Sequence, residues 1–332
     1  MGKNKENEKI DIVILWVDGN DEKWLQEKDK YLQVKGDSNI NRFRDCGNLQ
    51  YLFRGIEKYA SWVNNIFFVT WGHLPKWLNT DNPKIKIVKH EDFIPKEYLP
   101  TFNSNVIEMN LHRIKDLSSK FILFNDDLFI LKKLEPQDFF ENNLPKDMYI
   151  EYLKKNSSRR HQVLRNNYSN IIKKYFNKKE FVKNNLSKIF NYKYGIKNFD
   201  TMRMLRYKEF QDIYTQHLTQ PFIKETFNEV WENEYEKLNE ACYNKFRADT
   251  DIGYAICRYW QMLTGKFIPT KRIGKYFIME DDNEKLVKTI KNHKYKIICI
   301  NDAKTDINFE NAKQQINNAL NEVFKEKSSF EI

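Results

Sequence analysis

Two groups of polar residues follow short apolar runs and carry side chains that could bind a metal ion. Asn125, Asp126 and Asp127 come directly after one such run, and Asn301 and Asp302 come after another near the end of the chain. Hard oxygen ligands of this kind suit magnesium or manganese, which keep waters and share substrate phosphates. The alternative is that these residues only cap turns, where Asn and Asp are common.

Three further residues could assist a reaction beside such a site. His217 is a candidate general base because a free histidine titrates near neutral pH, and Glu108 is its rival. On a helix, Glu108 and His112 would share one face because they are four residues apart. Arg247 offers a planar group that could hold phosphoryl oxygens. Each residue also has a structural interpretation, such as a core histidine or a surface ion pair.

The elements that must position these residues alternate between strands and helices over the first 130 residues. Short runs rich in branched and aromatic residues predict strands at 11–17, 65–70, 84–88 and 121–124. Apolar residues at helical spacing predict helices at 48–60 and 104–117, the second with Ser104 as a possible N-cap. The alternation predicts an open, largely parallel α/β sheet, with ligands beyond the carboxyl ends of the strands, where Asp18 and Asp126 lie.

The character of the chain changes near residue 145. Residues 146–206 are rich in Lys and Asn and compatible with helices, and residues 207–265 also indicate helices. Residues 295–300 predict a late strand, and residues 308–324 predict a closing helix. We therefore expect an α/β core (1–145) that binds donor and metal, a basic helical insertion (146–206), and a final part (207–332). The late strand of that part would return to the core sheet and bring Asp302 to its edge.

Composition excludes several classes of protein. The chain has 332 residues, of which 41% are hydrophobic and 15% aromatic, so it is not disordered. Its longest unbroken apolar run covers residues 12–17, too short to span a membrane, and the polar residues 1–9 lack a signal peptide core. The four cysteines have no C-x-x-C spacing, so we expect reduced thiols and a cytoplasmic protein.

The positive charge is concentrated in one segment. The net charge is +10, and residues 151–200 contain 13 Lys or Arg against 3 Asp or Glu. This segment is either a solvated helical face or a surface for a polyanion or for acidic lipid head groups. No nucleic-acid-binding motif is recognisable, so we expect no nucleic-acid partner.

Several long motifs in the same order resemble the Stealth family. The first block is Ile-Asp-Ile-Val-Ile-Leu-Trp-Val-Asp-Gly-Asn-Asp from residue 10. The second begins at Arg42, Phe43, Arg44 and Asp45 and runs through residues 69–72, 100–114 and 124–127. Residues 217–251, with His217, Arg247 and Asp251, resemble the third block, and residues 298–302 the fourth. Cys46 and Asn48 stand where relatives typically have Asn and Glu, next to the expected donor site.

The resemblance implies a phosphotransferase of the hexose-1-phosphate type. Stealth proteins are sugar-1-phosphate transferases, and bacterial members build phosphodiester-linked capsular or cell-wall polysaccharides. The resemblance therefore implies a UDP-sugar donor, a hydroxyl of an oligosaccharide or polysaccharide as acceptor, Mg²⁺ or Mn²⁺, and UMP as leaving group. It also implies a nucleotide-sugar-transferase-like mixed sheet of the GT-A or Rossmann-like kind. The charge is compatible with peripheral contact at the acidic inner face of the cell membrane.

The resemblance also assigns roles to residues around an in-line attack on the β-phosphorus of the donor. Asp126 and Asp302 would bind the metal with Asp127 in reserve, Arg247 would hold phosphoryl oxygens, and His217 or Glu108 would be the base. Five residues would bind substrate: Asp18, Gly19, Arg44, Asp45 and Arg113. A conventional UDP-sugar glycosyltransferase, which would release UDP, and a non-enzymatic polyanion-binding protein remain the alternatives.

Overall fold

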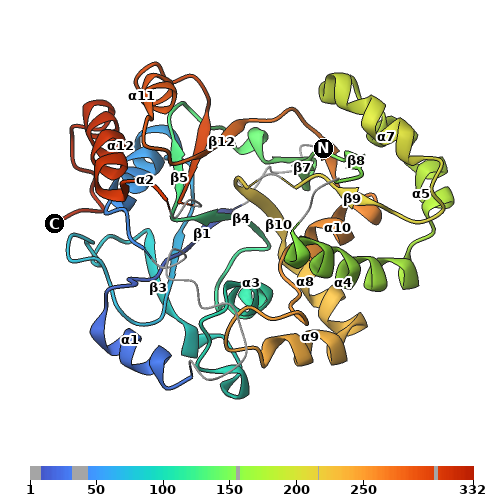
Figure 1. The fold of residues 1–332 in the computed structure, drawn as a ribbon, viewed down its shortest axis with the longest axis horizontal. Coiled ribbons are helices and arrows are strands. Elements are labelled where there is room, and N and C mark those ends of the chain that lie inside the picture. The colour runs from blue at the N-terminus through green and yellow to red at the C-terminus, as the bar shows by residue number, and fades with distance from the viewer. Residues whose placement is uncertain (1–8, 32–43, 155–157, 216, 303–305) are drawn as a thin grey trace, which may run out of the picture.

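The computed structural model describes residues 9–31, 44–154, 158–215, 217–302 and 306–332 (Figure 1). Arg42 and Phe43 of the second block and Lys155 of the basic segment lie outside the described residues. A five-stranded sheet has the order β10-β4-β1-β2-β3. Its strands are β1 (Ile10–Leu15), β2 (Ile66–Thr70), β3 (Ile85–Lys89), β4 (Lys120–Asn125) and β10 (Gln220–Ile223). The first four are parallel and β10 is antiparallel to β4.

The predicted α/β class with a mixed sheet is confirmed, and its physical cause is visible in β1. Val13 packs into one hydrophobic core, whereas Ile12 and Ile14 pack into a second core on the opposite face. Successive side chains of a strand point to opposite faces, so a strand that is covered on both sides must be apolar throughout. This is why β1 contains the first four residues of the unbroken apolar run at 12–17.

A second sheet holds the late strand, which corrects one prediction. It consists of β5 (Leu128–Ile130), β12 (Gly274–Ile278) and β13 (Ile297–Asn301), with β13 in the middle. The late strand therefore does not return to the first sheet. It pairs antiparallel with β5, which follows β4 after a two-residue turn, so the two sheets meet at residues 126 and 127.

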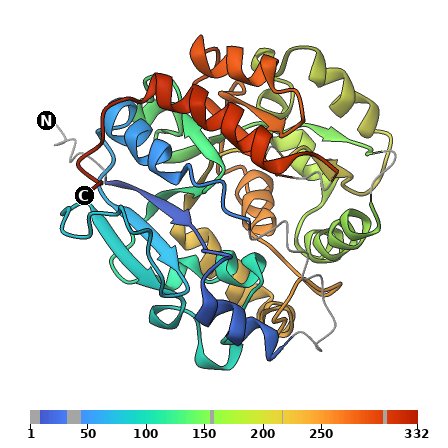
Figure 2. The same ribbon diagram turned by 60° about the vertical axis from the view of Figure 1, so that its left-hand side comes forward.

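Helices α2 (Leu49–Tyr59), α11 (Glu284–Lys291) and α12 (Phe309–Val323) accompany this second sheet, and α1 (Glu22–Asp29) follows β1. Figure 2 shows α12 lying along α2. The hydroxyl of Tyr51 in α2 hydrogen-bonds Asn321 of α12 at 3.4 Å, and Asn48 bonds Asn317 at 3.1 Å. The predicted helices at 48–60 and 308–324 are confirmed.

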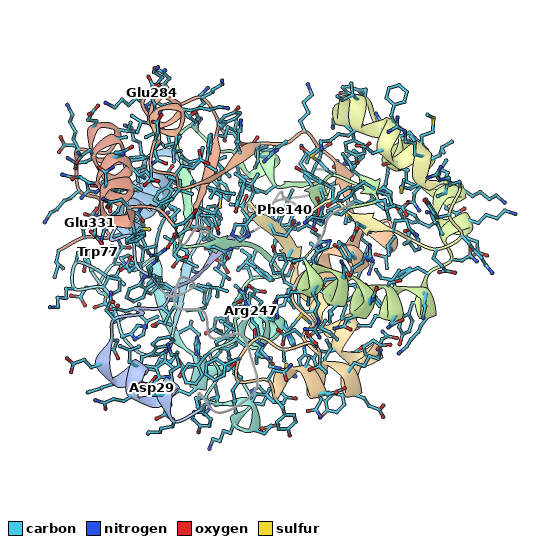
Figure 3. The ribbon with its side chains drawn as sticks, viewed as in Figure 1. Asp29, Trp77, Phe140, Arg247, Glu284 and Glu331 are labelled. Atoms are coloured by element: carbon cyan, nitrogen blue, oxygen red, sulfur yellow. The ribbon has the colours of Figure 1, made fainter. Side chains whose placement is uncertain are left out.

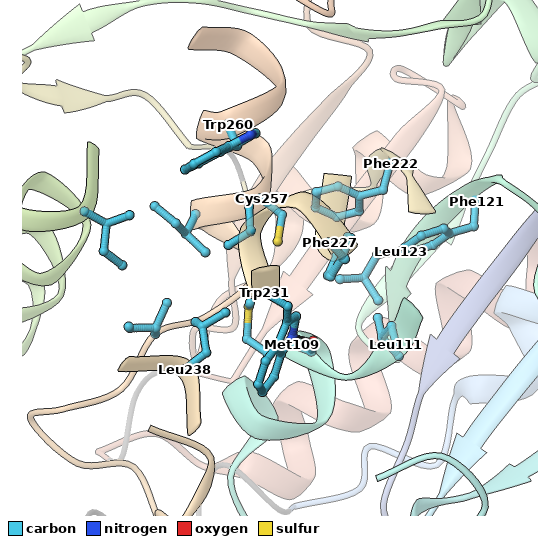
Figure 4. Packing of buried hydrophobic residues seen from close by; sticks show 14 of the residues in the cluster. Met109, Leu111, Phe121, Leu123, Phe222, Phe227, Trp231, Leu238, Cys257 and Trp260 are labelled. Carbon is cyan, nitrogen blue, oxygen red and sulfur yellow. Dashed lines mark hydrogen bonds between the residues drawn. The ribbon is translucent and has the colours of Figure 1, made fainter. Parts of the chain in front are cut away.

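The opposite face of the first sheet is covered by α3 (Ser104–Met109), α8 (Lys224–Asn233), α9 (Tyr235–Cys242) and α10 (Ala255–Leu263). Figure 4 shows the core between them and the sheet, in which Phe121 of β4 and Phe222 of β10 meet Phe227 of α8. These ring contacts attach the edge strand β10 to the helical half. Sequence reasoning missed β10 because it is short and contains Pro221, a residue tolerated in sheets mainly at edges.

The predicted helix at 104–117 ends early. Asn103, and not Ser104, is its N-cap, because the Asn103 side chain accepts a hydrogen bond from the backbone N–H of Asn105. The α-helix stops at Met109, and a short 3₁₀ turn (Leu111–Arg113) follows. At the break, the side chain of Asn110 donates to the carbonyl of Val106 at 2.8 Å, and such side-chain bonds compete with helix continuation.

The basic insertion is largely helical, as predicted. It contains α4 (Arg159–Tyr175), α5 (Lys178–Asn184), α6 (Leu186–Ile189), a 3₁₀ segment (Tyr192–Lys197) and α7 (Asn198–Met204). Short strands join it to the remainder: β6 (Phe140–Glu141), β7 (Leu144–Asp147) and β11 (Ile268–Pro269) in one sheet, and β8 (Glu151–Tyr152) with β9 (Asp212–Ile213) in another. Among the described residues, no helix combines the length and apolar character needed to cross a bilayer.

Candidate active site

The turn between β4 and β5 places two carboxylates where the two sheets meet. Asp126 and Asp127 occupy this turn, directly after Asn125 at the carboxyl end of β4. The neighbouring strand β1 ends level with β4, since Leu15 is in register with Asn125. The predicted location of the carboxylates at the edge of a parallel sheet is therefore confirmed, and the second sheet adds β13 to the same place.

Asp127 is the centre of a hydrogen-bonded cluster. Its Oδ2 atom lies 3.1 Å from His217 Nε2, accepts from the Cys299 thiol at 3.1 Å, and accepts more weakly from Asn301 Nδ2 at 3.4 Å. Its Oδ1 atom is buried and has no hydrogen-bond partner among the described residues. One oxygen thus holds three neighbours, while the other makes no hydrogen bond within the described part of the chain.

The register of β10 explains how His217 reaches this cluster from far away in the chain. Gln220 pairs with Leu123 in the antiparallel ladder between β10 and β4. Continuing that register places residue 217 level with residue 126. The approach to β10 therefore runs past the β4–β5 turn and delivers the imidazole to Asp127.

The His217 ring is held on one side and open on the other. Its side chain is 42% exposed, and the ring of Tyr276 packs edge-on against it with centroids 5.8 Å apart. Burial lowers the pKa of His217, but the hydrogen bond to Asp127 and the charge of that carboxylate outweigh it. The charges of Glu108 and Asp126 add to this effect, so the pKa of His217 is raised above 6.5.

Asp126 lies in surroundings that are short of positive charge. Burial, together with the charges of the neighbouring carboxylates of Asp127 and Asp45, raises the pKa of Asp126 to about 7. A carboxyl group with this pKa is only partly ionised near neutral pH. A cation placed beside it would restore full ionisation, because an opposite charge favours the charged form.

Asp302 is brought to the same region, but it is already paired. Both of its carboxylate oxygens accept from the Arg44 guanidinium, at 2.7 and 2.8 Å. Burial raises the pKa of the Cys46 thiol to about 12, and the charges of Asp302, Asp126 and Asp45 contribute. These three carboxylates therefore surround Cys46, so the structure brings together the donor-site and metal-site residues predicted from three separate segments.

Glu108 approaches the cluster from α3 and is buried. Burial raises the pKa of Glu108 to about 8, while the charge of His217 and the backbone N–H of Tyr254 act in the opposite direction. The expected partner on the same helix face, His112, is not there because the helix ends before it. The His112 ring instead stacks on Phe227, and burial lowers its pKa to about 3.

Arg247 lies on a loop beside the start of α3, near the middle of the molecule in Figure 3. Its guanidinium donates to the hydroxyl of Ser104 at 3.0 Å. The loop that carries it is held by Asp251, a buried carboxylate that accepts from Asn103 at 2.8 Å and from Arg160 of α4 at 2.7 Å. Arg247 is therefore a partly exposed cation on a fixed loop beside the helix that carries Glu108.

The loop after β1 lies against the loop after β2. The backbone N–H of Asp18 donates to His73 Nε2 at 2.8 Å, and the Asp18 side chain accepts from the backbone of Asn20 at 2.9 Å. Burial lowers the pKa of His73, although Asp21 and Asp18 act against this. Asp18 and Gly19 thus occupy the predicted carboxyl edge of the sheet.

The structure does not bring Arg113 to this edge. Its guanidinium donates to Asn110 at 3.0 Å and lies 4.9 Å from the centre of the Trp231 ring. The chain that follows it is tied down by Lys224, whose amine bonds two carbonyls within 114–117. Lys224 directly follows the end of β10 that pairs with Lys120, at the start of β4. Arg113 therefore lies toward the opposite edge of the sheet, where it packs on Trp231.

Asp127, His217 and Cys299 also bring one potential ligand atom each within 4.8 Å of one another, close enough to hold a metal ion. A thiol binds a metal as its thiolate. Burial and the charge of Asp127 raise the pKa of Cys299 far above its ordinary value, and its thiol donates to Asp127. These three residues are therefore better described as a hydrogen-bonded cluster than as a metal ligand set.

Sequence reasoning missed Cys299 as a member of the site, and it did not predict that Asn301 would bond Asp127. Residues two apart on a strand share a face, so the predicted late strand could have indicated that both side chains point the same way. The pairing of Asp127 with His217 had no comparable signal, because 90 positions separate them and strand β10, which follows His217 and positions it, was not recognised.

Family models match the first half of the chain. The model described as Stealth protein CR1, conserved region 1, matches residues 8–33. The model described as Stealth protein CR2, conserved region 2, matches residues 42–148. The CR1 match includes Asp18 and Gly19. The CR2 match includes Asp45, Glu108 and Asp126.

Over nearly its full length, the chain is similar to named bacterial transferases. It is 43% identical to the capsular polysaccharide phosphotransferase WcwK of Streptococcus pneumoniae, covering 98% of this chain and 99% of the relative. It is 36% identical to the exopolysaccharide phosphotransferase cps2G of Lactiplantibacillus plantarum, covering 97% of this chain and 96% of the relative. Among solved structures, the galactosyltransferase LgtC in complex with donor and acceptor sugar analogs aligns over 96% of this chain and 98% of that chain, with a TM-score of 0.41 and 10% identity.

Proposed function

The chain belongs to the Stealth family, and its relatives are named polysaccharide phosphotransferases, so we propose that it is one too. In the proposed reaction it transfers a sugar-1-phosphate from a UDP-sugar. The acceptor is a hydroxyl group of a growing polysaccharide, the product is a phosphodiester, and UMP is released. The pathway is the synthesis of a capsular or other surface polysaccharide. This proposal is supported by the agreement between the relatives' names and a site rich in carboxylates, with one imidazole open to solvent.

The observation that carries the proposal is the His217–Asp127 pair beside Asp126. If His217 donates its Nε2 proton to Asp127, the lone pair of the ring lies on Nδ1. That nitrogen can then accept the proton of an acceptor hydroxyl, as a general base does. Asp127 is a positioning residue in this scheme, because it orients the ring and stabilises the imidazolium that forms.

The proposed transfer forms one bond to phosphorus and breaks another. The acceptor oxygen forms a bond to the β-phosphorus of the donor as its proton passes to His217. The bond between the β-phosphorus and the bridging oxygen breaks, and its electron pair leaves with UMP. Phosphoryl transfer of this kind depends mainly on positioning and charge neutralisation.

The residues present fit a divalent metal. Asp127 keeps one buried oxygen without a partner among the described residues, and Asp126 has a raised pKa that a cation would lower. Asp126 and Asp302 would hold Mg²⁺ or Mn²⁺, with Asp127 in reserve, because carboxylate oxygens suit these hard ions. When bound, the ion would neutralise the diphosphate charge. Asp302 would then exchange part of its pairing with Arg44 for the metal.

Several neighbouring residues have proposed roles in substrate binding. Arg44, once released from Asp302, and Arg247 would hold phosphoryl oxygens through their planar groups of N–H donors. Asp18 and Gly19 would contact the nucleotide at the end of β1, and Asp45 would lie next to the donor. These roles are supported by the shared location of the residues at the sheet edge.

Glu108 is the second candidate for the base, and the geometry favours His217. At neutral pH a carboxyl group with a pKa of about 8 is mostly protonated and cannot accept a proton. Glu108 is also buried, whereas His217 is open to solvent. We therefore assign Glu108 to the support of His217.

We further propose that the enzyme works in the cytoplasm at the inner face of the cell membrane, where a lipid-carried polysaccharide would be within reach. The test of the function is direct. The purified protein is incubated with a panel of UDP-sugars, Mg²⁺ or Mn²⁺ and an oligosaccharide acceptor, and the nucleotide product is identified by chromatography. UMP together with a phosphodiester-linked product supports the proposal, whereas UDP indicates a conventional glycosyltransferase.

A further inference from the structure

Most of the described cations in the first half of the basic segment are paired within the fold. Five cations on α4 and at the start of α5 face carboxylates on other elements, and one of these pairs is fully buried. The five ion pairs join Arg159 to Asp249, Arg160 to Asp251, Arg165 to Asp212, Lys174 to Glu234, and Lys178 to Glu151. Most of the charge of this half is therefore already paired within the protein.

The following stretch, residues 183–208, keeps its charge. It contains seven basic residues and one acidic residue, Asp200. None of the seven forms an ion pair with another residue in the described part of the chain. They are Lys183, Lys188, Lys193, Lys197, Arg203, Arg206 and Lys208.

The same stretch exposes large apolar side chains. Of the thirteen large hydrophobic residues that are exposed among the described residues, six lie between positions 186 and 205. Ile196 is 84% exposed and Phe199 is 59% exposed. The other four are Leu186, Tyr192, Met202 and Leu205. We call residues 183–208 with these side chains the basic apolar surface.

Helix α7 exposes apolar side chains although it is packed against the rest of the protein. The inner face of α7 is buried through Thr201 and Met204, and the Thr201 hydroxyl accepts from the backbone N–H of Glu151 at 3.1 Å. Phe199 and Met202 therefore point outward from a helix that is firmly attached. A surface helix normally presents polar residues outward, whereas α7 presents Phe199 and Met202 beside Arg203. Figure 1 shows α7 at the outer margin of the molecule, far from α12.

We propose that the basic apolar surface docks on an anionic lipid bilayer. Exposed apolar side chains enter the boundary between head groups and acyl chains, while flanking Lys and Arg contact acidic head groups. The inference rests on the proposed work at the membrane and names the face that makes the contact. A polyanionic polysaccharide fits less well, because it would pair with the cations but would leave six apolar side chains without a partner.

The experiment measures binding to vesicles without substrates, so its outcome does not depend on catalysis. The full chain is mixed with vesicles of phosphatidylglycerol and phosphatidylcholine or of phosphatidylcholine alone, and bound protein is measured by co-sedimentation. We expect binding to the anionic vesicles that weakens as salt rises, since screening shortens the reach of surface charges. Failure of the wild-type protein to bind anionic vesicles at low salt would overturn the proposal.

Two triple variants test the two components. Ile196→Ser with Phe199→Ser and Met202→Ser removes the apolar contact. We expect at least a tenfold loss of vesicle affinity, with residual binding that vanishes at high salt. These positions are exposed, so the thermal transition should stay near that of the wild type.

The charge variant carries Arg203→Gln, Arg206→Gln and Lys208→Gln. We expect a loss of affinity of at least tenfold for anionic vesicles and little change for phosphatidylcholine. UMP release with a short, water-soluble acceptor should be unchanged in both variants, because the surface lies outside the proposed site. A defect with this acceptor would count against the proposal, since it would give the surface a role in the reaction.

A matched control distinguishes the effect of the basic apolar surface from the effect of lowering the net charge of the protein. Lys23→Gln, Lys86→Gln and Lys325→Gln remove three exposed cations elsewhere. The control should bind vesicles within about twofold of the wild type. If the control loses as much vesicle affinity as the charge variant, the surface is not a bilayer-docking face. The same conclusion follows if the charge variant still binds vesicles but no longer binds a soluble acidic polysaccharide.

Discussion

Replacing Glu108 by glutamine should change how the stability of the protein depends on pH. The side chain is buried on α3, where burial raises its pKa from 4.5 to about 8. Glutamine has nearly the same shape but cannot ionise. The substitution therefore removes one titration from the folded state and leaves the packing almost intact.

The direction follows from proton linkage. The folded protein holds the Glu108 proton more tightly than the unfolded chain, so the contribution to stability is complete below pH 4.5 and is lost as pH rises through about 8. Each unit of pKa shift corresponds to about 1.36 kcal/mol, so the whole effect is on the order of 4–5 kcal/mol. The free energy of unfolding of Glu108→Gln minus that of the wild type should grow by up to this amount between acid and mildly alkaline pH.

The assay is urea unfolding of both proteins at several pH values between about 4 and 9. Asp126 titrates in both proteins, so its effect cancels in the difference. Glu225→Gln, which changes an exposed carboxylate on α8, should give a difference that is flat with pH. An equally flat difference for Glu108→Gln would refute the assignment of a raised pKa to this buried group.

Two further predictions concern the reaction. His217→Ala should lower turnover by roughly 10²–10⁴-fold while UDP-sugar binding, measured by calorimetry, survives; a normal rate with weakened binding would move His217 to a binding role and promote Glu108. Turnover should require a divalent metal, and Asp126→Asn or Asp302→Asn should abolish it without unfolding the protein; full activity in excess chelator would contradict the proposed metal site.

Local patterns were sufficient to predict the core of the fold. The apolar run that became β1 and the runs that became β2 and β4 are strands because parallel strands buried on both faces need continuous apolar sequence. The partners of the late strand could not be predicted. Nothing in residues 297–301 distinguishes pairing with β4 from pairing with β5, since both choices bury the same apolar side chains.

The sequence predicts which residues belong to the candidate site better than it predicts how those residues pair. Asp126 and Asp302 stand at strand ends, a position that sequence reveals. The Arg44–Asp302 pair and the His217–Asp127 pair depend on tertiary packing across 258 and 90 positions, so local sequence carries no sign of them. Arg113 is the opposite case. It belongs to a motif that resembles the family, but it lies toward the other edge of the sheet, where it packs on Trp231.

The central claim is that the bond broken lies between the two phosphates of the donor. The most direct measurement uses a UDP-sugar carrying ³²P only at its β-phosphorus, with the purified enzyme, a divalent metal and an oligosaccharide acceptor. The proposed mechanism predicts that the label appears in the acceptor product and that the released nucleotide, UMP, is unlabelled. Label recovered in UDP, with an unlabelled glycoside as product, would contradict it.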